Sequence, residues 1–163
     1  MPESATIKPS LFEALQAFLS EERLPAAFGQ TFVAWYAGMT RHLAARADVN
    51  TQPLLVGVSG CQGSGKSTLA KAMARIAHEV FGTPATTLSL DDFYLTQTER
   101  KRLSESIHPL FATRGVPGTH DLALLNSTLQ ALTKVDGPVA LPEFDKARDE
   151  RTKSVHWRQV CAP

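Results

Sequence analysis

The sequence is poor in cysteine and has almost no excess of charge of either sign. Its 163 residues include two cysteines, Cys61 and Cys161, far apart and without the spacing of a zinc site, so no disulfide framework or zinc site is expected. The net charge of +1 gives no reason to expect a nucleic acid or an anionic membrane as partner. The only dense basic run, Arg100 to Arg102, follows Glu99, and we interpret it as solvated surface.

Long apolar runs are also missing. No stretch approaches the roughly 20 apolar residues that span a bilayer, and the N-terminus lacks the basic and apolar regions of a signal peptide. A cytoplasmic protein is therefore expected, and its length suits one domain. The sequence gives no indication of an oligomeric state.

The first 50 residues have the pattern of helices. Ser10 and Glu13 have the spacing of a capping box, in which each side chain accepts a hydrogen bond from the other residue's backbone N–H. Apolar residues follow at helical spacing: Leu11, Leu15, Phe18 and Leu19. A second helix is expected from about Gln30, with an apolar stripe that should pack against the rest of the domain: Phe32, Trp35, Tyr36, Met39 and Leu43. We predict that residues 1–50 form a helical N-terminal extension.

The next segments have the pattern of a strand, a helix and a second strand. Residues 54–58 form a short apolar run, residues 66–80 have an amphipathic helical pattern that ends at Gly82, and residues 86–90 resemble a second buried strand. This βαβ order predicts an α/β fold with a parallel sheet and flanking helices. Further on, we expect a short helix near residues 98–104 and a longer one with Asp121 as its N-cap, whereas the tail from Asp145 has no clear periodicity. We predict one domain over residues 51–163.

A phosphate-binding loop lies between the first expected strand and the helix. Residues 60–67 match the pattern G-x-x-x-x-G-K-[ST] at every fixed position. Glycines allow the backbone N–H groups to surround phosphate oxygens, and the helix N-terminus adds the positive end of its dipole. Lys66 would reach the outer phosphates, and Ser67 would offer its hydroxyl to Mg²⁺. The residues expected to bind the nucleotide are Gly60, Cys61, Gln62, Gly63, Ser64, Gly65, Lys66, Ser67 and Thr68.

Two aspartates follow the second expected strand. In open α/β sheets, ligands bind at the carboxyl ends of the strands. A kinase needs a carboxylate there to accept the proton of the acceptor hydroxyl and another oxygen to help hold Mg²⁺. We therefore assign Asp91 as the base, with Lys66 as the second catalytic residue, and Asp92 as support for the base or the metal. The alternative is a surface turn, and the sequence does not decide which of the two aspartates is the base.

The region around these aspartates resembles a known family. Residues 89–96, S-L-D-D-F-Y-L-T, resemble the corresponding segment of the uridine kinase, phosphoribulokinase and pantothenate kinase group, and the resemblance is strongest to the D-glycerate 3-kinase branch. Residues 108–110, 114–121 and 141–148 agree with that branch. The P-loop alone occurs in many families, but its combination with R-G-x-P-G-T-H-D and P-x-F-D-K is far more specific.

This resemblance implies phosphorylation of a small hydroxy acid, D-glycerate above all, by ATP with Mg²⁺. It places four residues around the acceptor, Tyr94, Arg114, His120 and Lys146, and Arg151 near a phosphate or the acceptor. The residues themselves leave other roles open: Arg114 suits a carboxylate but also a surface loop, His120 could order the turn before Asp121, and Lys146 could pair with its neighbour.

The resemblance also implies that family members continue well beyond residue 163, so we expect a truncated domain whose activity does not follow automatically from that of the family. Three alternatives stay open: a kinase for a nucleoside or pantothenate, a nucleotide-dependent switch, and a fragment that binds nucleotide without catalysis. A switch is suggested by residues 133–136, T-K-V-D, which resemble a guanine-binding motif. That motif should follow a strand, but here it ends a helical pattern.

Overall fold

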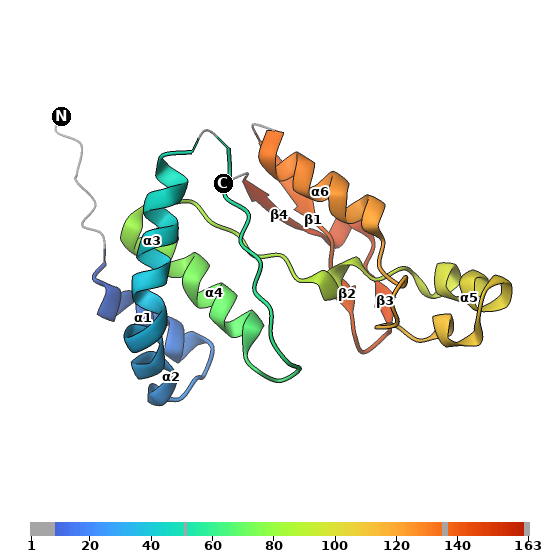
Figure 1. The fold of residues 1–163 in the computed structure, drawn as a ribbon, viewed down its shortest axis with the longest axis horizontal. Helices are drawn as coiled ribbons and strands as arrows, with labels where there is room; N and C mark the ends of the chain where they lie inside the picture. The colour runs from blue at the N-terminus through green and yellow to red at the C-terminus, as the bar shows by residue number, and fades with distance from the viewer. Residues whose placement is uncertain (1–8, 51, 135–136, 162–163) are drawn as a thin grey trace. The chain divides into compact units, whose positions relative to one another are not determined.

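The fold is described from a computed structural model that covers residues 9–50, 52–134 and 137–161. The chain divides into two compact units, one that ends at Thr87 and one that begins at Leu88. Figure 1 shows the helices and strands of the two units along the chain. None of the helices in the described ranges has the length and apolar content that a membrane crossing requires.

The first unit is built from helices. Ser10 and Glu13 form the expected capping box at the start of the first helix, with 2.8 Å from Ser10 N to Glu13 Oε2 and 3.2 Å from Glu13 N to Ser10 Oγ. The second helix begins earlier than expected, directly after Pro25, and contains a π-helical turn. In chain order the elements are α1 (Leu11–Glu21), α2 (Ala26–Thr31), η1 (Phe32–Tyr36), α3 (Ala37–Asp48), α4 (Lys66–Ile76) and η2 (Ala77–Phe81).

The core of this unit joins α1 to α4. Its buried members are Ala14, Leu15, Phe18, Phe32, Ala72, Met73 and Ile76. Two ion pairs lie beside it, Glu22 with Lys71 at 3.0 Å and Glu21 with Arg75 at 2.5 Å. The N-terminal helices therefore share one core with the helix that follows the phosphate-binding loop.

The expected apolar stripe is only partly buried. Phe32 is fully buried, and Tyr36 and Leu43 pack against the core, but Trp35 is 76% exposed and Met39 is 43% exposed. The π-turn η1 explains the difference, because its extra residue per turn rotates the following side chains around the helix axis relative to a regular α-helix.

The second unit combines helices with two antiparallel strand pairs. Strand β1 (Pro138–Leu141) pairs with β4 (Arg158–Cys161), and β2 (Phe144–Asp145) pairs with β3 (Glu150–Arg151). Its helices are η3 (Leu90–Phe93), α5 (Gln97–Ser106), η4 (Pro109–Ala112), α6 (Leu122–Lys134) and η5 (Ser154–His156). Asp121 caps α6 as expected, since its Oδ1 accepts a hydrogen bond of 2.9 Å from Leu124 N. Thr133 and Lys134 end this helix; Val135 and Asp136 of the T-K-V-D motif lie outside the described residues.

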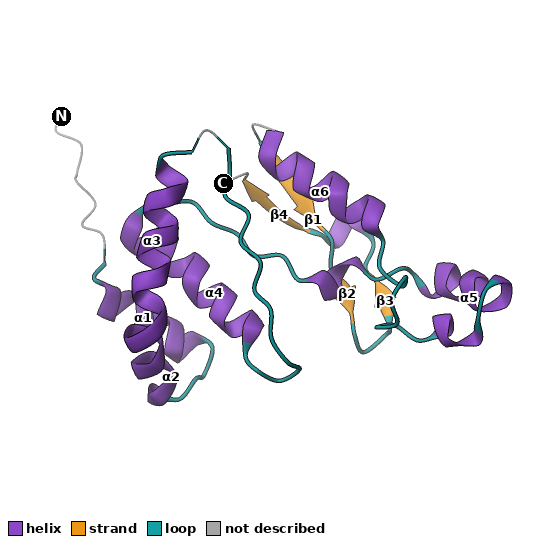
Figure 2. Ribbon diagram, in the orientation of Figure 1, coloured by secondary structure: helices purple, strands orange, loops and turns teal. Residues whose placement is uncertain are grey.

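Two expected strands do not form ladders. Residues 54–58 and 86–89 are not assigned to strands, and the strands in the described ranges pair antiparallel (Figure 2). A strand needs neighbouring backbone groups as partners, and no described segment provides a ladder to either of these runs. Leu55 and Val56 are accordingly 73% and 46% exposed. The tail after Asp145, in which the sequence shows no clear periodicity, carries β3 and β4.

Candidate functional site

The loop of the first unit that is expected to bind phosphate has the backbone that its glycines predict. Gly65 has φ +80° and lies directly before α4, a conformation that residues with a Cβ rarely adopt. A Cβ on Gly60 would lie 2.9 Å from Ser64 Oγ. The first backbone N–H groups of α4 have no acceptor within the helix, so this loop presents donors where an anion would bind.

The side chain of Lys66 closes back onto this loop. Its Nζ donates to the carbonyl oxygens of Gly60, at 2.7 Å, and Cys61, at 2.6 Å. Ser67 is exposed in the first turn of α4, and Thr68 beside it is half-buried. The ammonium group is therefore already held within the loop, where phosphate oxygens could replace the two carbonyls.

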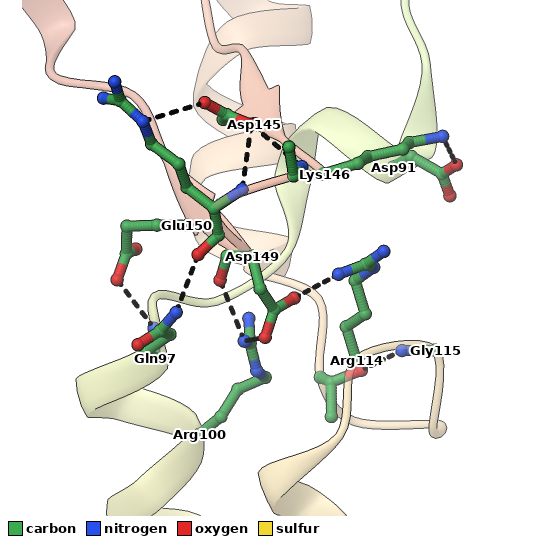
Figure 3. A network of polar contacts seen from close by, with 12 residues as sticks. Asp91, Gln97, Arg100, Arg114, Gly115, Asp145, Lys146, Asp149 and Glu150 are labelled. Atoms are coloured by element: carbon green, nitrogen blue, oxygen red, sulfur yellow. Dashed lines mark hydrogen bonds and ion pairs between the residues drawn. The ribbon is translucent and has the colours of Figure 1, made fainter.

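In the second unit, the carboxylate of Asp91 lies among polar side chains from other segments. Lys146 Nζ lies 2.6 Å from Asp91 Oδ2 (Figure 3). The hydrogen bond from Lys146 holds the pKa of Asp91 below its usual range, with smaller contributions from Tyr94 and His120. Asp91 is thus an ionised, half-exposed acceptor.

The neighbouring aspartate has a different environment. Asp92 Oδ1 accepts a hydrogen bond of 3.2 Å from the backbone N–H of Phe144 in β2. Burial raises the pKa of Asp92 above its usual value. Asp91 therefore lies beside the residues expected around the acceptor, whereas Asp92 connects η3 to β2.

Tyr94 and His120 form a stacked pair beside Asp91. Their ring centroids are 4.3 Å apart, and their backbones form an isolated antiparallel bridge. Burial raises the pKa of the Tyr94 phenol, and the charge of Asp91 raises it further, so the phenol stays protonated. The R-G-x-P-G-T-H-D segment thus places His120 against the D-D-F-Y segment.

The two arginines expected near the acceptor are both paired with carboxylates. Arg114 donates through Nη1 to Asp149 Oδ1 and remains one-third exposed. Arg151 is only 12% exposed, with Nη1 2.9 Å from Asp121 Oδ2 and Nη2 3.5 Å from Glu99 Oε2. The contacts of Arg151 connect the N-terminal ends of α5 and α6, so its expected contact with a phosphate or the acceptor stays a prediction.

The sequence interpretation missed a buried arginine. Arg100 is 1% exposed, whereas Lys101 and Arg102 beside it are exposed, so the interpretation of the basic run as solvated surface was wrong for Arg100. Its guanidinium donates to the carbonyl oxygens of Leu95 at 2.6 Å and Asp149 at 3.1 Å. Five fixed donors allow an arginine to be buried where backbone carbonyls converge. No local sequence signal distinguishes Arg100 from its exposed neighbours, because the oxygens that it binds come from separate segments of the chain.

The residues expected to hold Mg²⁺ supply few ligands by themselves. Across the described residues, no group of three or more His, Cys, Asp or Glu side chains could hold a metal ion. Ser67 and Asp92, the expected ligands, belong to different units. Their hydroxyl and carboxylate oxygens suit Mg²⁺, which commonly takes only one or two protein ligands and completes its shell with water and substrate phosphates.

Comparisons with known proteins identify the class of protein. No family model matches the chain. The chain is 42% identical over 117 residues to an uncharacterized kinase, mug58, from Schizosaccharomyces pombe. This match covers 67% of this chain and 42% of that protein. It is 29% identical over 106 residues to a uridine kinase from Deinococcus deserti, covering 63% of this chain and 46% of that protein. The homologues are thus kinases, and the α/β fold class agrees with theirs.

Within this class, D-glycerate 3-kinases are among the relatives. The chain is 35% identical over 121 residues to the chloroplastic D-glycerate 3-kinase of Arabidopsis thaliana, covering 68% of this chain and 26% of that protein. The solved structure of D-glycerate 3-kinase from Cryptococcus neoformans superimposes with a TM-score of 0.64 at 34% identity, over 81% of this chain and 49% of that one. The chain is therefore homologous to part of these kinases, D-glycerate 3-kinases among them, and it spans less than half the length of each of these proteins.

Proposed function

We propose that this chain carries the phosphate-binding loop and the acceptor-binding residues of an ATP-dependent small-molecule kinase, and that its acceptor is D-glycerate. The observation that carries the proposal is the environment of Asp91, whose carboxylate lies 2.6 Å from Lys146 Nζ and beside the Tyr94–His120 pair. A general base with cationic neighbours suits an acceptor that has both a hydroxyl and a negative charge.

The proposed reaction gives each of the predicted catalytic and metal-binding residues one role. Asp91 accepts the proton of the acceptor hydroxyl while that oxygen forms a bond to the γ-phosphorus of ATP. The bond from this phosphorus to the β–γ bridging oxygen breaks, and ADP leaves. Lys66 and the N–H groups of its loop stabilise the negative charge on the phosphates. Mg²⁺, when bound, would neutralise further charge on these oxygens, with Ser67 and Asp92 as its expected protein ligands.

Charge distinguishes the proposed acceptor from the main alternative. Uridine kinases are also among the relatives, and uridine is a neutral acceptor. Lys146 and Arg114 would be favourable neighbours for a carboxylate, and Arg114 can bind two carboxylate oxygens at once. This favours a hydroxy acid over a nucleoside. The cytoplasmic location stays a prediction.

The test is ADP release by the purified chain with D-glycerate, uridine or pantothenate as separate acceptors. We expect release with D-glycerate, and loss of that release in Lys66→Ala and Asp91→Asn. Release with uridine alone would contradict the proposed acceptor but not the kinase class. No release with any acceptor, together with Mg-ATP binding that depends on Lys66, would identify a nucleotide-binding fragment without catalysis.

A further inference from the structure

Asp149 has an unusual backbone conformation for a residue with a side chain. Its φ is +54°, in the left-handed region that glycine normally occupies. Aspartate and asparagine tolerate this region better than other residues, but at some cost in conformational energy. Such an outlier directs attention to the contacts that the side chain makes.

The side chain of Asp149 is shared by two arginines. Arg100 Nη2 donates both to Asp149 Oδ2, at 2.5 Å, and to the Asp149 carbonyl oxygen, at 3.1 Å. The other carboxylate oxygen, Oδ1, accepts from Arg114 Nη1 (Figure 3). One carboxylate thus joins a buried guanidinium to a partly exposed one.

Arg100 holds this carboxylate in one place. Its other donors bond to backbone carbonyls of two further segments, with 2.6 Å from Nη1 to Leu95 O and 3.4 Å from Nε to Ala112 O. At 1% exposure, it has no freedom to follow a moving carboxylate. The position of Asp149 is therefore set by the packed interior of the unit and not by solvent.

Arg114 is held in place by a contact that uses only one of its three nitrogens. The carbon Cζ of Arg114 lies 5.8 Å from the centroid of the buried Phe144 ring, as does Cζ of Arg100. Among the described residues, Nε and Nη2 of Arg114 have no hydrogen-bond partner. The charge of Arg114 also acts on the phenol of Tyr94, whose ring stacks on His120.

We propose that Asp149, held by Arg100, is a positioning residue that orients Arg114 so that its two unpaired nitrogens bind the carboxylate of the acceptor. The proposal rests on the proposed function for the identity of the acceptor, but the orientation of Arg114 by Asp149 can be tested without it. Neither Arg100 nor Asp149 touches the reacting groups in this proposal; both act through Arg114.

The first measurement is the order of the Arg114 side chain, from ¹⁵N relaxation of its Nε–Hε group in the full chain without ligand. Asp149→Asn is the informative variant, because asparagine keeps the shape and tolerates the positive φ while losing the charge. The matched control is Asp145→Asn, which makes the same charge change at a residue bonded instead to Ala147 N and Arg148 N. We expect Arg114 to lose order in Asp149→Asn only; an unchanged Arg114 in a folded variant would overturn the proposal.

The second measurement is the dissociation constants of D-glycerate and of Mg-ATP for the same proteins. Asp149→Asn should weaken D-glycerate binding by about tenfold and leave Mg-ATP binding within about twofold, since tenfold corresponds to the loss of one charge-assisted contact. In an Arg114→Lys background, the same change should have little further effect, because the two residues act as one unit. An equal loss for both ligands, or additive effects, would contradict the proposal.

Two further outcomes are distinguishable. If Asp149→Asn does not fold, Asp149→Glu keeps the charge for Arg100 and lengthens the side chain by one methylene, and it should still weaken D-glycerate binding. If the wild-type chain does not bind D-glycerate but Arg114 loses order in Asp149→Asn, the proposed acceptor is wrong and the positioning role of Asp149 stands.

Discussion

The ammonium group of Lys146 lies 2.6 Å from the carboxylate of Asp91, although 55 positions separate the two residues in the sequence. Lys146 lies in the turn between β2 and β3, and Asp91 lies in η3. Both side chains are partly exposed to solvent. Lys146 keeps Asp91, the candidate general base, ionised. A negatively charged substrate could compete with Asp91 for the ammonium group of Lys146.

The pH dependence of phosphoryl transfer tests this pair. Because Lys146 lowers the pKa of Asp91, replacing it by methionine should raise that pKa and move the acid limb of the kcat/KM profile to higher pH. Lys146→Arg should keep the limb near its wild-type position, and Lys153→Met, a change at an exposed lysine nearby in sequence, should not move it. An acid limb that stays in place in Lys146→Met would show that Asp91 is not the titrating base.

The same pair has a consequence for stability. A carboxyl whose pKa is lowered on folding stabilises the folded chain above its unfolded pKa, and this stabilisation is lost as pH falls through the lower, folded value. The wild-type chain should therefore have a higher unfolding free energy than Lys146→Met at neutral pH, and this difference should shrink in acid. Denaturant unfolding at neutral and at acidic pH measures this difference.

Two glycines in the first unit should respond in opposite directions to alanine. Gly65→Ala should lower the unfolding free energy by about 1 kcal/mol, because φ +80° strains a residue with a Cβ. Gly38→Ala should raise it by about 0.5–1 kcal/mol, since Gly38 lies within α3 with open space around its Cβ position. Urea unfolding of both variants gives the comparison, and stabilisation by Gly65→Ala would contradict the backbone described for the loop.

The buried arginine predicts a large loss of stability. Arg100→Ala should destabilise the second unit by about 3 kcal/mol, because it leaves buried carbonyl oxygens and the Asp149 carboxylate without donors. The control, Arg102→Ala, removes an exposed arginine from the same helix and should change stability by less than about 0.5 kcal/mol. Equal effects of the two variants in thermal unfolding would mean that Arg100 is not buried as described.

The shared core of the first unit predicts that the N-terminal helices are needed for the phosphate-binding loop. Ile76→Ala should cost about 2–5 kcal/mol, since Ile76 is fully buried against α1 residues. Phe12→Ala removes a larger side chain of α1 that is 68% exposed and should cost far less. Removal of residues 9–22 should abolish Mg-ATP binding along with the fold of the unit. Retained binding would instead support the expected boundary near residue 50, which stays a prediction.

Local signals were the most reliable part of the sequence interpretation. The capping box of Ser10 and Glu13, the N-cap at Asp121 and the helix after Lys66 depend on residues within a few positions of each other, and all are present. The strands at 54–58 and 86–90 depend on partners elsewhere, and no described segment provides them. The periodicity of residues 32–43 was only partly confirmed for a different reason, since a π-turn shifts the helical register without a sequence signal that we recognised.

In the candidate site, too, some residues were indicated by the sequence and others were not. The motif predicted the loop around Lys66, and the family resemblance indicated Tyr94, His120 and Lys146, which the structure brings to Asp91. Nothing in the local sequence indicated Arg100 or Asp149, because their importance comes from three segments that meet in space. The roles of these residues in binding substrate stay predictions.

The contact of Lys66 with the carbonyls of Gly60 and Cys61 bears on how a nucleotide would arrive. Because the ammonium already has two carbonyl partners, phosphates that bind here would have to replace them: two carbonyl hydrogen bonds would be given up as two phosphate contacts form. The net enthalpy of binding is then a difference between similar terms, and the lysine has little rotational freedom left to lose. The affinity of such a loop for a nucleotide would then depend on two quantities. One is the free energy needed to break the two hydrogen bonds between Lys66 and the carbonyls, and the other is the fit of the phosphates.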